Sequence, residues 1–333
     1  MYPYFKYPLI GFLVFIVLLV LVVRGCGKDK PQEPAGSAPV TVAPVPEPTS
    51  VQPPATNPSA TVTTSPAVQP PSSAPATAIS PEVEGLLSNA KAQLDNGMLE
   101  AARQIARRVL RNPEVIEFDK TWRRAAEIID AADKKLMNST APVTEKQRYV
   151  VVQGDNLTVI AKRKYISVNS LTRINKNVSL EKAIRPTQTL MYIAGKWSIR
   201  VSKQHYLLLL YLNDELYRIY TVGIGRDNRT PTGHFLITNL AENPAWYRND
   251  GQIIGFGDPE NLLGTRWLKL TPTEDTDPSL EGYGIHGTWD PESCGTSCSD
   301  GCVRMRNEDV EELFDFIPQP GGKVPPVHVI IEE

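Results

Sequence analysis

The stretch Tyr283–Val310, YGIHGTWDPESCGTSCSDGCVRMRNEDV, places a histidine and three evenly spaced cysteines within 28 residues. A cysteine reacts as its thiolate, and a nearby imidazole or positive charge favours that form. His286, Cys302 and Arg304 are therefore candidates for a base, a nucleophile and a supporting charge. Gly301 allows a tight bend that exposes the sulfur and aims backbone N–H groups at an acyl oxygen. The stretch predicts cysteine-dependent acyl chemistry.

The other two cysteines of this stretch, Cys294 and Cys298, admit three interpretations. They could form a disulfide in an oxidising compartment and leave Cys302 free. They could join His286 and Cys302 as zinc ligands, although Cys-x3-Cys-x3-Cys is not a usual zinc spacing. They could also remain free thiols. The spacing alone does not decide among the three.

The residues around this stretch predict a mainly-β domain. From Trp197 to Gly225 the chain has strand-like runs, and Asn213-Asp214 between them is a hairpin signal. A further tight turn is expected between Pro231 and Gly233. A helix is expected to follow the last cysteine, from about Asn307.

Four ordered motifs in this region resemble the catalytic domain of the YkuD-type L,D-transpeptidases, over about residues 199–331. The motifs are Thr-Pro-Thr-Gly (230–233), Leu-Gly-Thr-Arg (263–266), Gly-Ile-His-Gly-Thr (284–288) and Ser-Asp-Gly-Cys-Val-Arg-Met (299–305). The resemblance implies a β-sandwich-like barrel that needs no metal or cofactor. It also implies an enzyme that cross-links the third residues of peptidoglycan stem peptides through a cysteine thioester. With water as acceptor the same chemistry gives a carboxypeptidase, and with a protein amine a protein-to-peptidoglycan ligase.

The resemblance also implies a role for individual residues of this sequence. Cys302 would be the nucleophile and His286 the general base, with the Gly287 backbone orienting the imidazole. Arg304 would support the site, either near a substrate carboxylate or by holding the loop. The residues expected to contact substrate are Ser299, Gly301, Tyr283 and Trp289. Tyr283 and Trp289 flank the histidine motif, and packing in the core is an equal explanation for these two.

Asp300 departs from the family pattern, because the common Ser-His-Gly-Cys is Ser-Asp-Gly-Cys here. A carboxylate pointing at the thiol would oppose thiolate formation. Asp300 is therefore expected to point outward or to pair with a cation. The same departure is the support for a different class of function, a non-catalytic scaffold that only grips peptidoglycan.

A second resemblance covers Tyr149–Ile193, where a strand, two short helices and a strand follow one another as in the LysM module. That module binds N-acetylglucosamine-containing glycans such as peptidoglycan, and Asn156 and Thr187 depart from its usual pattern. The matching residues are Tyr149, Val151, Gly154, Asp155, Leu157, Ile160, Ala161, Tyr165, Leu171, Asn175, Ile184, Gln188 and Leu190. The residues predicted to bind glycan are Gly154, Asp155, Asn156 and Leu157. A LysM-like spacer that binds nothing strongly is the alternative.

The N-terminal residues predict a membrane anchor followed by a tether. Leu9–Val23 is apolar throughout, with aromatic residues before it that suit a membrane interface. A cleaved signal, or a lipid on Cys26, is the alternative. Residues 31–80 are rich in Pro, Ala, Ser and Thr and cannot bury enough apolar surface to fold.

Three amphipathic helices are predicted to follow, resembling a tetratricopeptide-like hairpin plus one helix. Ser80-Pro81 is the start signal of the first helix, and Gly97 ends it. A spacer or a docking site for a partner would suit them. The formal net charge of −2 gives no reason to expect a nucleic acid partner.

The predicted order of parts is consistent with one location, the extracytoplasmic or periplasmic side of a membrane, where peptidoglycan lies. The parts are a membrane anchor (1–30), a disordered linker (31–80), a helical spacer (81–138), a LysM module (148–195) and a mainly-β catalytic domain (197–333).

Overall fold

The computed structural model describes residues 79–139, 143–248 and 250–333 of the chain. The predicted anchor, and all but the last two residues of the predicted linker, lie outside them, so both stay predictions. In the described part of the chain no helix is long and apolar enough to cross a membrane. All of the described residues belong to one compact unit.

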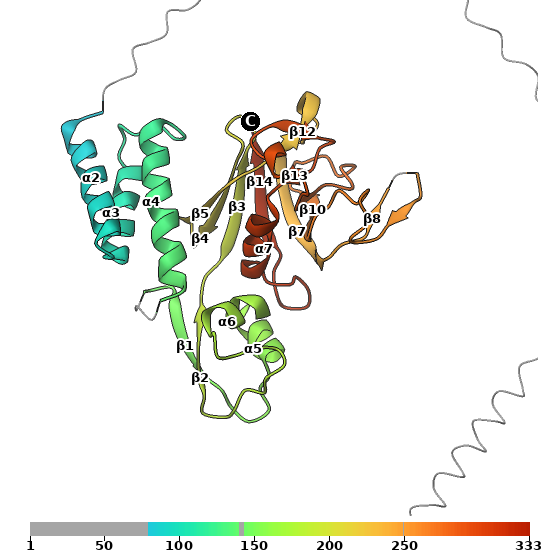
Figure 1. Cartoon of the computed structure of the whole chain (residues 1–333), viewed down its shortest axis with the longest axis horizontal. Coiled ribbons are helices and arrows are strands. Elements are labelled where there is room, and N and C mark those ends of the chain that lie inside the picture. The colour runs from blue at the N-terminus through green and yellow to red at the C-terminus, as the bar shows by residue number, and fades with distance from the viewer. Residues whose placement is uncertain (1–78, 140–142, 249) are drawn as a thin grey trace, which may run out of the picture. The chain divides into compact units, whose positions relative to one another are not determined.

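The described chain begins with three helices, α2 (Pro81–Asp95), α3 (Leu99–Leu110) and α4 (Lys120–Met137) (Figure 1). The first starts where its sequence signal predicts, because the Ser80 hydroxyl accepts a hydrogen bond from the backbone N–H of Val83 at 3.4 Å. Small residues fill the helix contacts, and several alanines on all three helices are fully buried. The three predicted helices are confirmed.

The LysM-like segment has the predicted order of strand, helix, helix and strand. Its elements are β1 (Lys146–Val150), α5 (Leu157–Lys164), α6 (Val168–Ile174) and β2 (Thr189–Ile193). The two strands pair antiparallel, and the helices pack on them around a small apolar core of their own.

The remaining chain forms a mixed eight-stranded sheet in the order β13-β11-β10-β7-β14-β3-β4-β5, which confirms the mainly-β prediction. The strands are β3 (Trp197–Ser202), β4 (Leu207–Leu212), β5 (Glu215–Thr221), β7 (Gly233–Glu242), β10 (Arg266–Thr273), β11 (Gly284–His286), β13 (Val303–Arg304) and β14 (Val327–Glu332). The pairs β14–β3 and β11–β13 are parallel. The smaller elements are β6 (Ile224–Gly225), η1 (Arg226–Asn228), β8 (Trp246–Tyr247), β9 (Ile253–Ile254), η2 (Pro291–Ser293), β12 (Ser297–Ser299) and α7 (Asn307–Phe316).

The hairpin between β4 and β5 forms at the predicted turn. Asn213 and Asp214 have φ angles of 52° and 63°, the left-handed conformation that a two-residue hairpin loop requires. Asparagine and aspartate tolerate this conformation better than most residues. The predicted helix also begins at Asn307.

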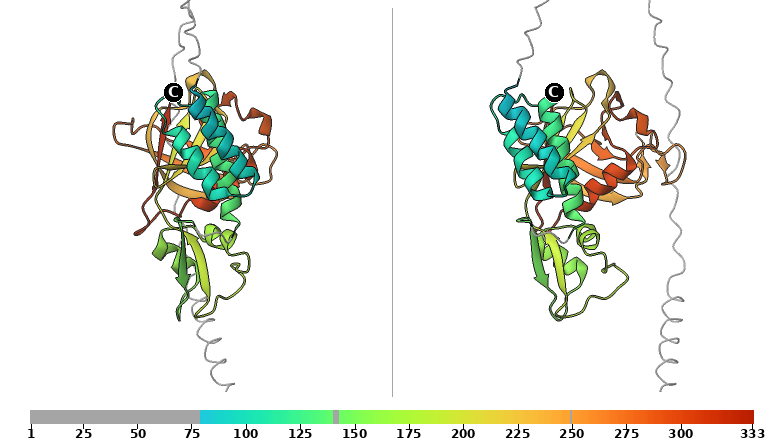
Figure 2. Two further views of the ribbon diagram at one scale, coloured as in Figure 1. Left: turned by 90° about the vertical axis from the view of Figure 1, so that its left-hand side faces the viewer. Right: turned by 60° about the vertical axis from the view of Figure 1, so that its left-hand side comes forward.

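Strand β4 carries four successive leucines because both of its faces are buried. Leu208 and Leu210 join the core of the catalytic domain, whereas Leu207 and Leu209 join the core of the three helices. The helices therefore cover the outer face of β4 and β5, as Figures 1 and 2 show. A strand with one solvated face would alternate apolar and polar residues instead.

Candidate active site

The predicted nucleophile and base come from two neighbouring strands. Strands β11 and β13 run parallel, with Ile285 opposite Val303, and both of these side chains point into the core. Because side chains alternate along a strand, His286 and the residue just before β13, Cys302, project from the other face. The structure thus brings both candidates to one face of the sheet.

The His286 side chain is buried, and its Nδ1 lies 2.6 Å from the carbonyl oxygen of Gly287. A carbonyl oxygen can only accept, so Nδ1 carries the hydrogen and Nε2 keeps its lone pair. Burial lowers the pKa of His286 to about 4, and the positive charge of Arg304 acts in the same direction, against the backbone hydrogen bonds to Gly287 and Leu263. The imidazole is therefore a neutral base at pH 7, held by the Gly287 backbone.

Trp267 is a site residue that the sequence analysis missed. It lies opposite His286 in the β10–β11 pair, and the two rings stack at 5.8 Å between centroids with 29° between their planes. Gly284 makes room for the indole, because a Cβ there would lie 2.4 Å from the Trp267 ring. Its position directly after the Leu-Gly-Thr-Arg motif was the sequence signal that could have identified it as a site residue. The stacked indole fixes the orientation of the imidazole.

The turn before Cys302 is shaped by three of the predicted substrate-binding residues. The buried Ser299 hydroxyl donates to the Cys302 carbonyl at 2.6 Å and accepts from the Gly301 N–H at 3.1 Å. Gly301 has a φ of 136°, and a Cβ there would lie 2.7 Å from the ring of Tyr283. Ser299, Gly301 and Tyr283 therefore build the turn, and their contact with substrate stays a prediction.

The Cys302 side chain is partly exposed, and its Sγ donates to the Gly282 carbonyl at 3.7 Å. Burial raises the pKa of the thiol to about 11, although a backbone hydrogen bond from Gly284 and the charge of Arg304 oppose the shift. At neutral pH the resting site thus pairs a thiol with a neutral imidazole. His286 has to remove the proton as the sulfur attacks.

Arg304 holds the loop that carries the other two cysteines. Its Nη1 donates to Cys298 Sγ at 3.8 Å, and its carbonyl accepts from Cys294 Sγ at 3.9 Å. Both thiols are free in this structure, so a disulfide between them stays a prediction. Among the described residues, no group of three or more His, Cys, Asp or Glu side chains could hold a metal ion.

Asp300 points outward and pairs with cations, as expected from the sequence. Its carboxylate is 70% exposed and forms ion pairs with Arg226 and Arg229. The charge of Asp300 still contributes to the raised pKa of Cys302, as the smallest of its causes.

Trp289, the last predicted substrate-binding residue, is half exposed beside the histidine motif. Its Nε1 donates to the carbonyl of the buried Asn261 at 3.0 Å, and its ring lies 6.0 Å from that of Phe256. The indole is therefore held in place at the surface, and its contact with substrate stays a prediction.

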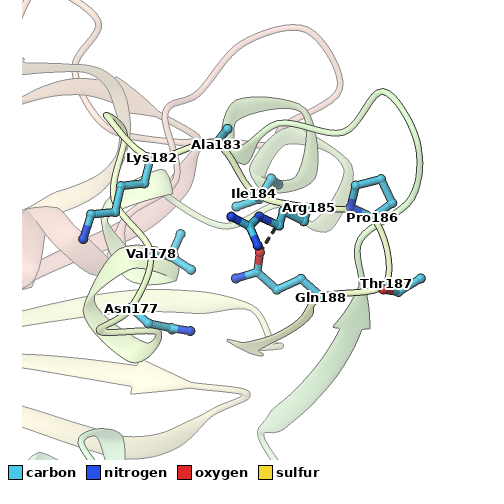
Figure 3. Close-up of a pocket in the computed structure, with 9 residues that line it drawn as sticks. All are labelled: Asn177, Val178, Lys182, Ala183, Ile184, Arg185, Pro186, Thr187 and Gln188. Carbon is cyan, nitrogen blue, oxygen red and sulfur yellow. Dashed lines mark hydrogen bonds between the residues drawn. The ribbon is translucent and has the colours of Figure 1, made fainter.

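A second candidate site is a pocket of about 760 Å³ in the LysM-like segment, between α6 and β2 (Figure 3). The Gln188 side chain closes one edge, where its Oε1 accepts from the Arg185 N–H at 3.1 Å. The lining residues are Asn177, Val178, Lys182, Ala183, Ile184, Arg185, Pro186, Thr187 and Gln188.

The residues predicted to bind glycan lie on the neighbouring loop and have roles in the fold. Asp155 accepts from the Tyr149 hydroxyl at 2.7 Å and pairs with Arg163. Asn156 caps α5, Leu157 is buried, and Gly154 has a φ of 87°. Their contact with glycan stays a prediction.

Thr187 joins this loop to the pocket, since its N–H donates to the Val151 carbonyl at 2.8 Å. Its φ of 71° is strained for a residue with a Cβ. This conformation explains why the LysM resemblance has glycine there.

Comparison with known proteins identifies the families of both domains. Residues 196–329 match the model of the L,D-transpeptidase catalytic domain, YkuD, and residues 149–191 match that of the LysM domain. The putative L,D-transpeptidase YkuD of Bacillus subtilis (strain 168) is 35% identical over 178 residues, which cover 51% of this chain and 93% of that protein. The chain belongs to the YkuD family of L,D-transpeptidases. The putative L,D-transpeptidase YqjB of the same organism is 41% identical over 127 residues, 38% of this chain and 69% of YqjB.

A crystal structure of L,D-transpeptidase 3 from Mycobacterium tuberculosis aligns with 45% of this chain and 76% of its own. The sequence identity is 13% and the TM-score is 0.33. At this TM-score the likeness adds nothing to the assignment, which rests on the sequence relatives. The resemblances to the YkuD and LysM families that were stated from motifs are confirmed.

The pH dependence of this L,D-transpeptidase should reflect a buried neutral pair. Because the pKa of His286 is lowered to about 4, the imidazole stays a base as the pH falls through 6.5, and kcat/KM should fall only near pH 4. Because the pKa of Cys302 is raised to about 11, alkylation by iodoacetamide should rise roughly tenfold per pH unit up to about pH 10.

Two pH profiles check this expectation, with Cys302→Ser as the background for alkylation. An acid limb near pH 6.5, or an alkylation plateau near pH 8.5, would mean that the resting pair is already ionised.

Proposed function

We propose that the YkuD domain cross-links peptidoglycan stem peptides through a thioester on Cys302. The observation that carries the proposal is the 2.6 Å contact between His286 Nδ1 and the Gly287 carbonyl oxygen, which assigns the hydrogen to Nδ1 and leaves Nε2 as a base. This base lies on the same sheet face as a partly exposed thiol. Nucleophile, base and orienting group are thus the three parts that cysteine acyl transfer requires.

The proposed acylation step begins when Cys302 Sγ attacks the carbonyl carbon of the third residue of a donor stem. His286 Nε2 takes the thiol proton during the attack and then delivers it to the nitrogen of the leaving D-alanine. The amide C–N bond breaks, and an S–C bond joins the acyl group to the enzyme. No oxidant or metal enters the balance.

The proposed second step transfers the acyl group to an amine. The amine of a second stem attacks the thioester carbonyl, the C–S bond breaks, and the amine proton returns to the sulfur through His286. A new amide then links two third residues. Water in place of the amine would give a carboxypeptidase, and a protein amine would give a protein-to-peptidoglycan ligase.

Incubation of the full chain with purified disaccharide tetrapeptides tests the proposal, with Cys302→Ser as control. Mass spectrometry of the products should find a dimer that has lost one alanine per cross-link, and no dimer with the variant. A tripeptide monomer without dimer would show hydrolysis. Unchanged substrate would favour the non-catalytic scaffold.

The LysM domain supports peptidoglycan binding, and we infer that it raises the concentration of stems near Cys302.

We also propose that the chain is tethered on the extracytoplasmic side of a membrane, for which the apolar run Leu9–Val23 and the Pro-rich segment after it are the support. Labelling of Cys302 in intact cells by a membrane-impermeant thiol reagent should succeed, and exclusive labelling after lysis would refute this location.

A further inference from the structure

Two exposed arginines lie beside the turn that carries the nucleophile. Arg226 and Arg229 are about half exposed, and both donate to the same oxygen of Asp300, Oδ1, with the Arg229 Nη1 at 3.0 Å. Asp300 lies two residues before Cys302 and is 70% exposed. The pairs are therefore open to water, and such contacts are weak and readily exchanged.

The segment that carries these arginines is fixed against the nucleophile turn by its backbone. The buried Thr230 hydroxyl donates to the Gly301 carbonyl at 2.8 Å and accepts from the Gly225 N–H at 2.7 Å. The Arg229 carbonyl lies so close that a Cβ on Gly301 would come within 3.0 Å of it. The backbone that carries the two arginines is thus held against Gly301, the residue before Cys302.

The same segment has an unusual backbone between the two arginines. Asp227 and Asn228 have φ angles of 51° and 58°, a left-handed conformation that aspartate and asparagine adopt more readily than most residues. Here the tight turn brings two guanidinium groups that are three residues apart to a single carboxylate oxygen.

We propose that Arg226 and Arg229 form a carboxylate-binding site that selects the acyl donor by the terminal carboxylate of its leaving residue. This inference rests on the proposed function. Arginine suits the task because its planar group donates two parallel hydrogen bonds to a carboxylate. In a donor stem that carboxylate is two bonds from the scissile nitrogen, so it arrives next to Cys302 together with the scissile bond.

Asp300 occupies this site in the absence of substrate. Its carboxylate stands where the donor carboxylate would bind, and the donor displaces it. The residue that departs from the family pattern is thereby a competitor for the donor, and its removal should strengthen donor binding.

Donor selectivity tests the proposal, using a tetrapeptide donor that ends in a free carboxylate and the same donor ending in an amide. For the wild-type chain, kcat/KM should favour the free carboxylate by about threefold to tenfold, the effect of two exposed charge-assisted contacts. In R226Q/R229Q the preference should fall to about one, mainly through KM. In R226K/R229K part of the preference should remain, because lysine keeps the positive charge but cannot donate two parallel hydrogen bonds to a carboxylate. The control R111Q/R124Q, which removes two exposed arginines that pair with Glu215 and Glu84, should keep the wild-type preference.

A binding measurement separates this proposal from the proposed function. In a Cys302→Ala background, calorimetry should give a lower Kd for the carboxylate donor than for the amide, and D300N should lower the first Kd severalfold without changing the second. If the donor binds in an arginine-dependent way but the wild-type chain does not convert it, cross-linking is refuted and the carboxylate-binding site is still supported. Equal loss with both donors in R226Q/R229Q would show that the arginines only hold the turn, and an unchanged preference would likewise overturn the proposal.

Discussion

Replacement of Cys302 by serine should lower the rate of acyl transfer by on the order of 10⁴-fold or more, because catalysis through a covalent intermediate depends on its nucleophile. A serine hydroxyl is a far weaker acid than a thiol, and a neutral buried imidazole cannot readily ionise it. Cys294→Ser should retain most of the activity, since its Sγ contacts the Arg304 carbonyl and the Gly223 backbone, and a hydroxyl can hydrogen-bond to both. The comparison assigns the chemistry to one of three similarly spaced cysteines.

Initial rates of dimer formation measure this effect, together with intact-mass analysis after treatment with a carbapenem. Wild type and Cys294→Ser should gain one adduct and Cys302→Ser none. Substantial turnover by Cys302→Ser, or an adduct that moves to Cys294 or Cys298, would contradict the assignment. The mass of the untreated chain reports at the same time whether Cys294 and Cys298 have lost two hydrogens to a disulfide.

Replacement of Asp133 by alanine should destabilise the chain by about 3 kcal/mol, because it removes the most buried of the three carboxylates that pair with Arg103 and leaves only Glu100 and Glu145. The Arg103 and Asp133 side chains are 2% and 1% exposed, with 2.7 Å between Nη1 and Oδ1. Burial raises the pKa of Asp133 to about 6, so the carboxylate is still ionised at neutral pH. The pair links α3 to α4, two of the helices that cover β4 and β5.

Urea unfolding of the described unit at pH 7 measures this cost. Asp95→Ala is the matched control, since it breaks an exposed pair with Lys91 and should change the free energy of unfolding by less than about 1 kcal/mol. The double change Arg103→Met with Asp133→Leu should recover much of the loss, because an apolar pair removes both buried charges. Similar free energies for Asp133→Ala and Asp95→Ala would show that burial of the first pair has no consequence.

Local signals in the sequence predicted the parts of this chain correctly where a few neighbouring residues decide the conformation. The Ser80 cap and the Asn213-Asp214 hairpin turn both formed as expected. The motifs around His286 and Cys302 also identified the family, because a reaction restricts residue types at fixed short spacings. These features depend on residues close in the chain, so the sequence alone could determine them.

Only the tertiary structure decided the contacts between residues distant in the chain. The position of Trp267 on the His286 ring depends on the register of β10 with β11, and the pairing of Asp300 with Arg226 and Arg229 depends on a segment some seventy residues away. The burial of both faces of the four-leucine strand β4 likewise depends on helices that lie about a hundred residues earlier in the chain. Strand register and helix packing are set by the summed burial of many side chains, and no short stretch of sequence contains that sum.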